Sequence, residues 1–148
     1  MVTHRGLVNY LSWCSEAYHV SDGCGSPVHS PLTFDLTVTG LLSPLCMGRA
    51  VTLVRDDVAG AGLVDALQSN AGYSLVKITP AHLVLLGHAI SDRPLAEWSN
   101  VLVVGGAALT SEMLTPFRAH EARPGQADTI AATIRRIQQM PASEKNSL

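Results

Sequence analysis

The segment SLVKITPAHLVLL, residues 74–86, decides the fold of this chain, because it joins a strand directly to a helix. Its first half, SLVKIT, is an apolar run with a single charge and predicts a strand. Thr79 and Pro80 then predict a helix start, because a threonine hydroxyl caps free N–H groups and proline fits the first turn at no hydrogen-bond cost. The helix that follows carries Leu83 and Leu86.

Further strands lie on either side of this segment. NVLVVGG (100–106) is a continuous Val/Leu run of the kind found in parallel sheets covered on both faces, and AVTLV (50–54) predicts another buried strand. Strands that alternate with helices predict right-handed β–α–β units. We therefore expect an α/β fold with a mainly parallel sheet flanked by helices. A helix is expected from Thr110, with these side chains inward: Met113, Leu114 and Phe117.

The N-terminal half predicts two helices separated by a loop. Residues 5–18 place apolar side chains three and four apart, which is typical of an amphipathic helix. Residues 21–31 are dense in Gly, Ser and Pro and predict a loop, ending in a short strand near residues 32–34. Helices are expected over 35–45 and 56–70. The side chains on the first helix face are Leu7, Tyr10, Leu11, Cys14 and Tyr18.

Composition limits the functional class. The chain has 148 residues, 47% apolar and 15% charged, which suits one domain with a buried core. A net charge of −2 with scattered Lys and Arg argues against nucleic-acid binding. No stretch reaches 18 apolar residues and no signal-peptide pattern opens the chain, so we expect no membrane partner.

The cysteines and histidines carry no ligand signature. Three cysteines without a CxxC pair indicate neither a disulfide scaffold nor a zinc site, and they fit a cytoplasmic location. The histidines show no HxH or HExxH spacing, so we predict no metal site from them. They are His4, His19, His29, His82, His88 and His120.

The C-terminal stretch differs from the rest. After Gly125 the composition turns polar, and Asp128 can cap a final amphipathic helix. We therefore expect one domain over residues 1–123, followed by a linker and a helix over residues 124–148. The apolar stripe of that helix is Ile130, Ile134, Ile137 and Met140.

Four segments together resemble the adenylation domain of nonribosomal peptide synthetases, which are adenylate-forming enzymes. Their order and spacing also match, and the resemblance covers about residues 2–123. It implies that the α/β fold is part of the large N-terminal subdomain of such an enzyme. The segments are VTHRGLVNYLSW (2–13), SPLTFDLTVTGLLSPLCMGRAVTLV (30–54), SLVKITPAHLVLL (74–86) and VLVVGGAALTSEML (101–114).

The resemblance also implies ATP and Mg²⁺ as the family's cofactors. In that family a phosphate-binding loop precedes the segment at residues 2–13, and an adenine motif, a ribose-binding aspartate and an adenylating lysine follow the segment at 101–114. None of these is found in this chain. We therefore expect a truncated adenylation segment that binds no cofactor and performs no catalysis alone, and no residue is assigned a catalytic role.

Asp35 matches the family position whose carboxylate holds the α-ammonium of the amino acid. A fixed carboxylate suits that task because charge-assisted hydrogen bonds are roughly twice as strong as neutral ones. The alternative is an aspartate that serves only as a helix cap.

Lys77 is the most informative residue of the chain, because an ammonium in an apolar strand is costly to bury unless an anion meets it. The resemblance implies that Lys77 lines the pocket and pairs with an acidic substrate side chain. Two alternatives stay open: an edge-strand lysine whose head reaches water, or a lysine paired with Asp35 in the empty pocket.

Six positions of the family's specificity pattern resemble aspartate-activating pockets most closely, with asparagine second. Asp35 takes the ammonium, Lys77 takes the side-chain carboxylate, and Thr39 donates a hydroxyl. Asparagine matches the lysine charge less well. The six positions are Asp35, Leu36, Thr39, Lys77, Val103 and Gly105.

A turn at residues 105–106 ends the last predicted strand. Glycines there let the backbone approach a ligand closely. In the family this turn runs beneath the amino acid and adenine, which implies that Gly106, Ala107 and Ala108 lie near the nucleotide. The family usually has Glu where Ala107 stands, so the local polar network differs here.

Two other functions remain open. One is a split helper module that docks to other synthetase segments, because a cut subdomain leaves apolar surface exposed. The other is a structural α/β remnant that binds nothing. A hydrolase or NAD enzyme is not favoured, because GxSxG and GxGxxG are absent.

Overall fold

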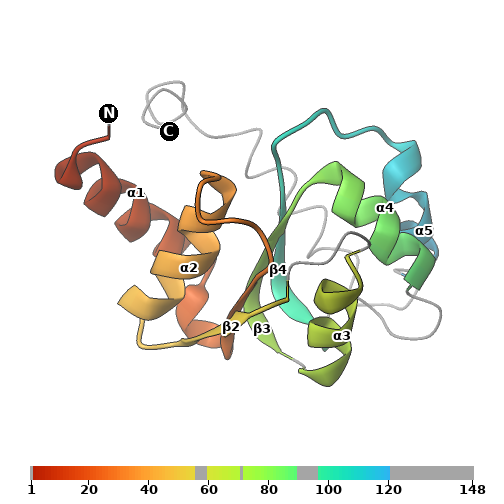
Figure 1. The fold of residues 1–148 in the computed structure, drawn as a ribbon, viewed down its shortest axis with the longest axis horizontal. Coiled ribbons are helices and arrows are strands. Elements are labelled where there is room, and N and C mark those ends of the chain that lie inside the picture. Colours follow the sequence, from red (N-terminus) through yellow and green to blue (C-terminus); the bar gives the residue numbers. More distant parts are fainter. Residues whose placement is uncertain (1, 56–59, 71, 90–96, 121–148) are drawn as a thin grey trace.

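The helices and strands follow in the order α1 (His4–Ala17), η1 (Val20–Asp22), β1 (Gly25–Val28), α2 (Leu36–Cys46), β2 (Ala50–Leu53), α3 (Ala61–Ser69), β3 (Tyr73–Ile78), α4 (Pro80–Ala89), β4 (Ser99–Val104), η3 (Glu112–Leu114) and α5 (Thr115–His120). The computed structural model describes residues 2–55, 60–70, 72–89 and 97–120. α1 and α2 lie on one side of the strands, and α3, α4 and α5 lie on the other (Figure 1). The predicted α/β class is therefore confirmed.

The strands form two parallel pairs, β1 with β2 and β3 with β4. β1 also lies beside β3, where the Cys24 N–H donates to the Gly72 carbonyl at 2.9 Å and the Gly25 N–H donates to Ser74 Oγ at 3.1 Å. Pro27 of β1 has no backbone N–H, so it cannot donate a hydrogen bond to a neighbouring strand. The predicted sheet is thus present as two pairs that meet through loop and side-chain bonds.

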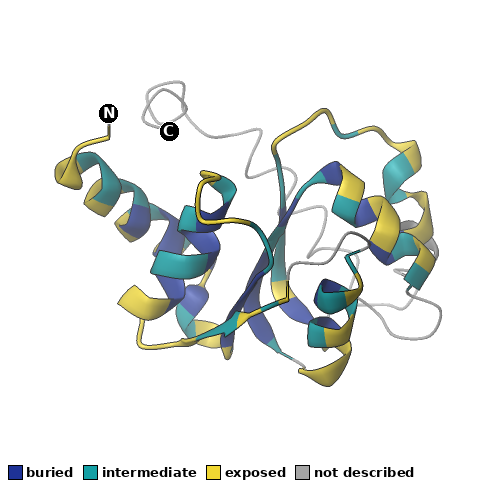
Figure 2. Ribbon diagram, viewed as in Figure 1, coloured by how far each residue is buried: buried dark blue, intermediate teal, exposed yellow. Residues whose placement is uncertain are grey.

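Alternate residues of β3 and β4 face opposite sides, as the strand geometry requires. Val76 and Ile78 pack with residues of α3, α4 and α5 into one core. Leu75 and Val103 pack with α1 and η1 into a second core. Figure 2 shows the buried residues on the strands and on the helix faces that meet them. The helix residues of the first core are Leu63, Leu67, Leu83, Leu86 and Phe117.

Helix starts follow the local sequence rules. The Thr3 side chain accepts from the Gly6 N–H at 3.2 Å and caps α1. Thr79 Oγ1 accepts from the His82 N–H at 3.4 Å ahead of α4, so the predicted start at Thr79 and Pro80 is confirmed. The predicted amphipathic face of α1 is also confirmed, because Leu11 and its neighbours pack into the second core.

Three predictions about strands are wrong. A strand, β1, lies within the predicted loop over 21–31, and all of its residues are buried. The sequence gives no signal for this strand, because Gly, Ser and Pro are poor strand formers. Residues 32–34 form a turn and not a strand. The predicted buried strand at 50–54 is an edge strand whose Leu53 is 77% exposed, because β2 pairs on one side only.

Two helix predictions are met only in part, and a third lies outside the described residues. The segment after Thr110 forms the short η3 and then α5, although Phe117 is buried as expected. α3 begins at Ala61, and residues 56–59 lie outside the described residues. The predicted C-terminal helix and the boundary at residues 123–124 also lie outside them. Within the described ranges, no helix is both long and apolar enough to cross a membrane.

Candidate functional site

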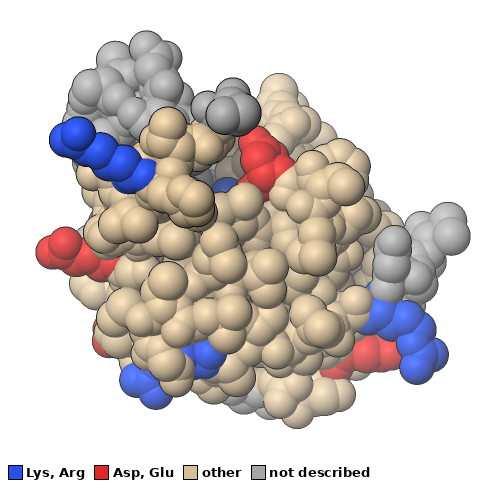
Figure 3. All heavy atoms as spheres, turned by 60° about the vertical axis from the view of Figure 1, so that its left-hand side comes forward, with Lys and Arg blue, Asp and Glu red and all other residues tan. Residues whose placement is uncertain are grey.

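A pocket of about 970 Å³ opens between α1, the segment before α2, and the carboxyl ends of β3 and β4. The carboxyl end of parallel strands is where α/β folds commonly bind ligands. Figure 3 shows a hollow with one basic and one acidic side chain beside it, on a surface that is otherwise mostly uncharged. Six of the predicted residues line the pocket: Asp35, Leu36, Lys77, Val103, Gly105 and Gly106.

Lys77 projects from the pocket face of β3, directly across from Val103 on β4. It is half-buried, and its Nζ donates a hydrogen bond to Thr39 Oγ1 at 2.7 Å. Burial lowers the pKa of Lys77, and the negative charge of Asp35 opposes that shift. The ammonium is therefore held inside the pocket by α2.

Thr39 does not itself line the pocket, because it is fully buried behind Lys77. It lies on α2 and also shares a 2.5 Å hydrogen bond with the Tyr10 hydroxyl of α1. Burial raises the pKa of Tyr10, and the hydrogen bond to Thr39 opposes that shift. Thr39 thus connects Lys77 to a pocket tyrosine that sequence reasoning placed only on a packing face.

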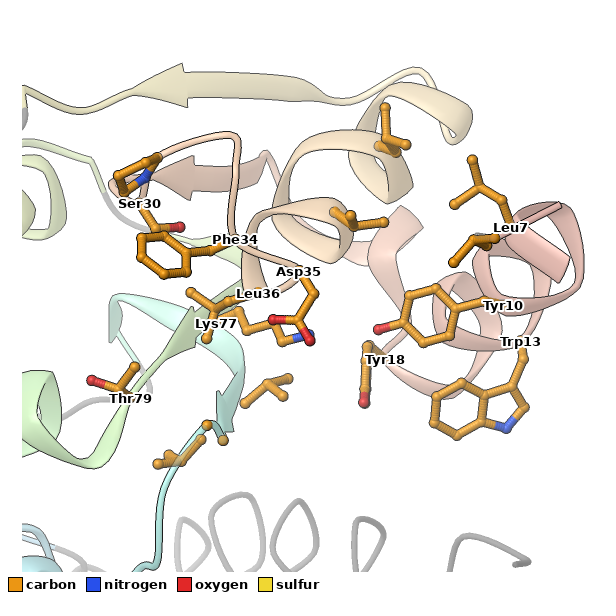
Figure 4. A pocket seen from close by; sticks show the side chains of 18 of the residues that line it. Leu7, Tyr10, Trp13, Tyr18, Ser30, Phe34, Asp35, Leu36, Lys77 and Thr79 are labelled. Atoms are coloured by element: carbon orange, nitrogen blue, oxygen red, sulfur yellow. The ribbon is translucent and has the colours of Figure 1, made fainter. Parts of the chain in front are cut away.

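Asp35 stands at the N-cap position of α2, but its side chain makes no capping hydrogen bond. The carboxylate is exposed and lines the same pocket as Lys77 (Figure 4). Within the described part of the chain, no ion pair joins the two side chains. Thr37 fixes the preceding turn, because its Oγ1 donates to the Pro31 carbonyl at 2.8 Å. Asp35 is therefore available to a ligand.

Two histidines of the pocket were not predicted as site residues. The Nε2–H of His29 donates to the Lys77 carbonyl at 3.0 Å, and the His29 and His82 rings lie 4.6 Å apart. His82 Nδ1 lies 2.7 Å from Thr79 Oγ1. Burial, together with His29, lowers the pKa of His82. No sequence spacing could pair them, because the contact depends on how β1 lies beside β3.

The turn after β4 leaves space for a ligand. Gly106 has φ +88°, a backbone conformation that L side chains rarely adopt, and a Cβ on Gly105 would meet no atom within 4 Å. Ala107 and Ala108 are exposed and are not among the residues that line the pocket. Of the four residues predicted at this turn, the structure therefore brings the two glycines to the pocket but not the two alanines.

The cofactors of the resembled family can be tested against these residues. Across 2–55, 60–70, 72–89 and 97–120, no group of three or more His, Cys, Asp or Glu residues could hold a metal ion. The residues that line the pocket include one lysine and no arginine. The described residues therefore do not fit a magnesium nucleotide on their own, because they offer no cluster of metal ligands and only one permanent positive charge in the pocket.

The chain is similar in sequence to segments of several curated synthases. No family model matches the chain. It is 31% identical over 120 residues to tyrocidine synthase 3 of Brevibacillus parabrevis and 34% identical over 115 residues to bacitracin synthase 3 of Bacillus licheniformis. It is 35% identical over 86 residues to part of the mycosubtilin synthase of Bacillus subtilis.

These matches cover 81%, 76% and 58% of this chain, respectively. The chain spans only 2% of the length of each of the first two relatives and 3% of the third. The homologues of this chain are nonribosomal peptide synthetases, and the chain corresponds to a short segment of them.

Proposed function

We propose that this chain is an adenylation-type synthetase segment that binds an amino acid, with aspartate favoured and asparagine second. The observation that carries the proposal is that Asp35 and Lys77 line one pocket with opposite charges and without an ion pair between them. A free aspartate molecule presents an ammonium and a side-chain carboxylate, which complement these two groups.

The chemistry of each wall supports this assignment. The exposed Asp35 carboxylate accepts charge-assisted hydrogen bonds from an α-ammonium. The Lys77 ammonium receives the side-chain carboxylate, and Thr39 holds the ammonium in place. Leu36 and Val103 supply apolar contacts along the ligand. An amino acid with an apolar side chain would leave Lys77 without an anion in a largely desolvated site.

Binding of a carboxylate is favoured because it pairs the desolvated ammonium of Lys77. Burial disfavours the charged form of Lys77 and lowers its pKa, and the negative charge of Asp35 compensates this only in part. A ligand carboxylate at the ammonium pairs this charge. We therefore expect binding to depend more steeply on Lys77 than on any exposed cation of the chain.

Titration calorimetry with L-aspartate tests the proposal. Lys77→Met keeps the side-chain length and removes the charge, so the Kd should rise at least about 30-fold, as expected for truncation of a hydrogen-bonded charge partner. Arg55→Met is the matched control, because Arg55 is exposed, follows β2 and does not line the pocket. Succinate, which lacks the ammonium, should bind weakly. The proposal fails when the unaltered chain gives no heat with aspartate.

The activity of the homologous synthetases extends the proposal to chemistry. We propose that the bound amino acid is the one that a synthetase containing this segment activates with ATP as an aminoacyl adenylate. The residues assigned here to that reaction only bind and orient the amino acid. Gly106, Ala107 and Ala108, which follow the pocket in the chain, are proposed to lie near the nucleotide.

A second candidate function is a helper module that docks to another synthetase segment. Exposed apolar side chains favour it, since Leu32, Phe34 and Leu53 are 72%, 59% and 77% exposed. Sedimentation velocity of the chain alone, and mixed with a purified synthetase module, tests this function. A stable complex at micromolar concentration supports docking, and unchanged sedimentation of both components contradicts it.

A further inference from the structure

A continuous chain of hydrogen bonds crosses three elements at the wall of the pocket. Lys77 Nζ of β3 lies 2.7 Å from Thr39 Oγ1 of α2, and Thr39 Oγ1 lies 2.5 Å from the Tyr10 hydroxyl of α1. Tyr10 and Lys77 both line the pocket, whereas Thr39 is fully buried between them. In Figure 4 the Tyr10 hydroxyl points towards the side of the pocket that holds Asp35 and Lys77.

The protons available fix the direction of the first hydrogen bond. A lysine ammonium only donates, so Thr39 Oγ1 accepts from Lys77. The Thr39 proton then needs an acceptor, and the Tyr10 oxygen is the other partner that the structure gives this hydroxyl. Thr39 Oγ1 has a second lone pair, so either hydroxyl can be the donor of the bond between Thr39 and Tyr10. With Thr39 as the donor, the proton of Tyr10 has no acceptor among the described residues.

Two other pocket hydroxyls have side-chain partners within the protein. Ser30 Oγ is 2.7 Å from Thr37 Oγ1, and Thr79 Oγ1 is 2.7 Å from His82 Nδ1. With Thr39 as the donor to Tyr10, by contrast, the Tyr10 hydroxyl keeps a proton that it can donate to a ligand beside Lys77. Burial raises the pKa of Tyr10, which keeps that proton in place at neutral pH.

We propose that Tyr10 is a specificity-determining residue of this pocket, whose O–H, together with the Lys77 ammonium, presents only donors and so selects a side-chain carboxylate over a carboxamide. The inference rests on the proposed function, and it goes further by assigning the choice between aspartate and asparagine to a residue outside the six positions of the specificity pattern.

The selection follows from hydrogen-bond chemistry. A carboxylate only accepts and can receive both donors at once, whereas a carboxamide carries an NH₂ that only donates. A carboxamide oxygen has two lone pairs and can also receive both donors, but it is neutral, and hydrogen bonds to a charged acceptor are roughly twice as strong as neutral ones. The carboxamide NH₂ finds no acceptor in the Lys77 ammonium or the Tyr10 O–H. We therefore expect asparagine to bind roughly tenfold more weakly than aspartate.

The test measures the ratio of the Kd for L-asparagine to the Kd for L-aspartate by calorimetry. Tyr10→Phe removes the proposed donor and should lower this ratio about tenfold, mainly by weakening aspartate binding. Thr39→Val breaks the chain at its middle and should act in the same direction, whereas Thr39→Ser keeps the hydroxyl and the ratio. Tyr73→Phe is the matched control, because it removes a tyrosine hydroxyl that lies in the core against α3, α4 and α5 and does not line the pocket.

The outcomes separate the two proposals. If the unaltered chain prefers aspartate and Tyr10→Phe weakens both ligands equally, Tyr10 has a structural role only and the inference is overturned, while the proposed function stands. If the unaltered chain binds neither amino acid, both are overturned. Circular dichroism confirms folding of each variant, and Thr39→Val decides the matter when Tyr10→Phe does not fold.

Discussion

The two faces of the β3–β4 pair are built from the same alternating strands but serve different ends. On the side of α3, α4 and α5, Val76 and Ile78 pack into a continuous apolar core. On the side of α1 and α2, Leu75 packs against a smaller core, and two residues further along β3, Lys77 projects into the pocket. The face towards α3, α4 and α5 therefore buries more apolar side chains, while the other face holds a charge.

The largest expected effect is on the packed face. Leu83 of α4 is 1% exposed, and Leu83→Ala should lower the free energy of unfolding by about 2–5 kcal/mol through lost burial and a cavity. Leu85→Ala on the same helix is the control, because Leu85 is 43% exposed. Urea denaturation measures both variants. Equal effects of the two variants would contradict the assignment of this core.

On the pocket face, we expect a substitution that stabilises the protein. Lys77→Met should raise the free energy of unfolding by about 1 kcal/mol, because it replaces a desolvated charge by an apolar chain of similar length. Arg55→Met, at an exposed site, should change it by less than about 0.5 kcal/mol. A clear loss of stability in Lys77→Met would show that the ammonium supports the fold.

The gain from Lys77→Met should depend on pH. The pKa of Lys77 lies below its ordinary value of 10.5 in the folded protein, so between these two pKa values the unfolded chain binds more protons. The stability of the unaltered chain therefore rises with pH in that window relative to the variant. The difference between the two is full below the folded pKa and disappears above about 10.5. A pH-independent difference in urea melts speaks against this origin.

The smallest expected changes in the free energy of unfolding come from replacing Tyr by Phe, once at Tyr10 beside the pocket and once at Tyr73 in the opposite core. Tyr10→Phe removes a hydroxyl that is bonded to Thr39 and should lower the free energy of unfolding by about 1 kcal/mol. Tyr73→Phe removes a buried hydroxyl that has no partner among the described residues and should raise it by about 0.5 kcal/mol. Thermal and urea melts measure both. A change in the free energy of unfolding with the same sign in both variants would contradict the assigned difference between the two hydroxyls.

The parts of the fold that follow local rules could be predicted from the sequence. Thr79 and Pro80 locate the start of α4, and the apolar spacing of α1 identifies its buried face, because caps and periodicity are local properties. β1 could not be predicted, since a strand made of Gly, Ser, Pro and Val is stabilised by its neighbours and not by its own propensity.

The candidate site, too, could be predicted from the sequence only in part. A lysine within an apolar strand pointed to a pocket, and the structure brings Lys77 and Asp35 to one cavity. Their role in binding an amino acid stays a prediction. The connection from Lys77 through Thr39 to Tyr10 could not be predicted, because it depends on how α1 packs across α2. The contact between His29 and His82 depends in the same way on strand placement.

The seam between β1 and β3 has a consequence for motion. After the bond from the Cys24 N–H to the Gly72 carbonyl, the contacts from Gly25 to Ser74 and from His29 to Lys77 use side chains, which water can replace more easily than a regular ladder. His29 directly follows β1 and Lys77 lies on β3, so the two residues lie on opposite sides of the contact between these strands. A separation of β1 from β3 along this seam would move His29 away from Lys77, and it would therefore widen the cavity that both residues line.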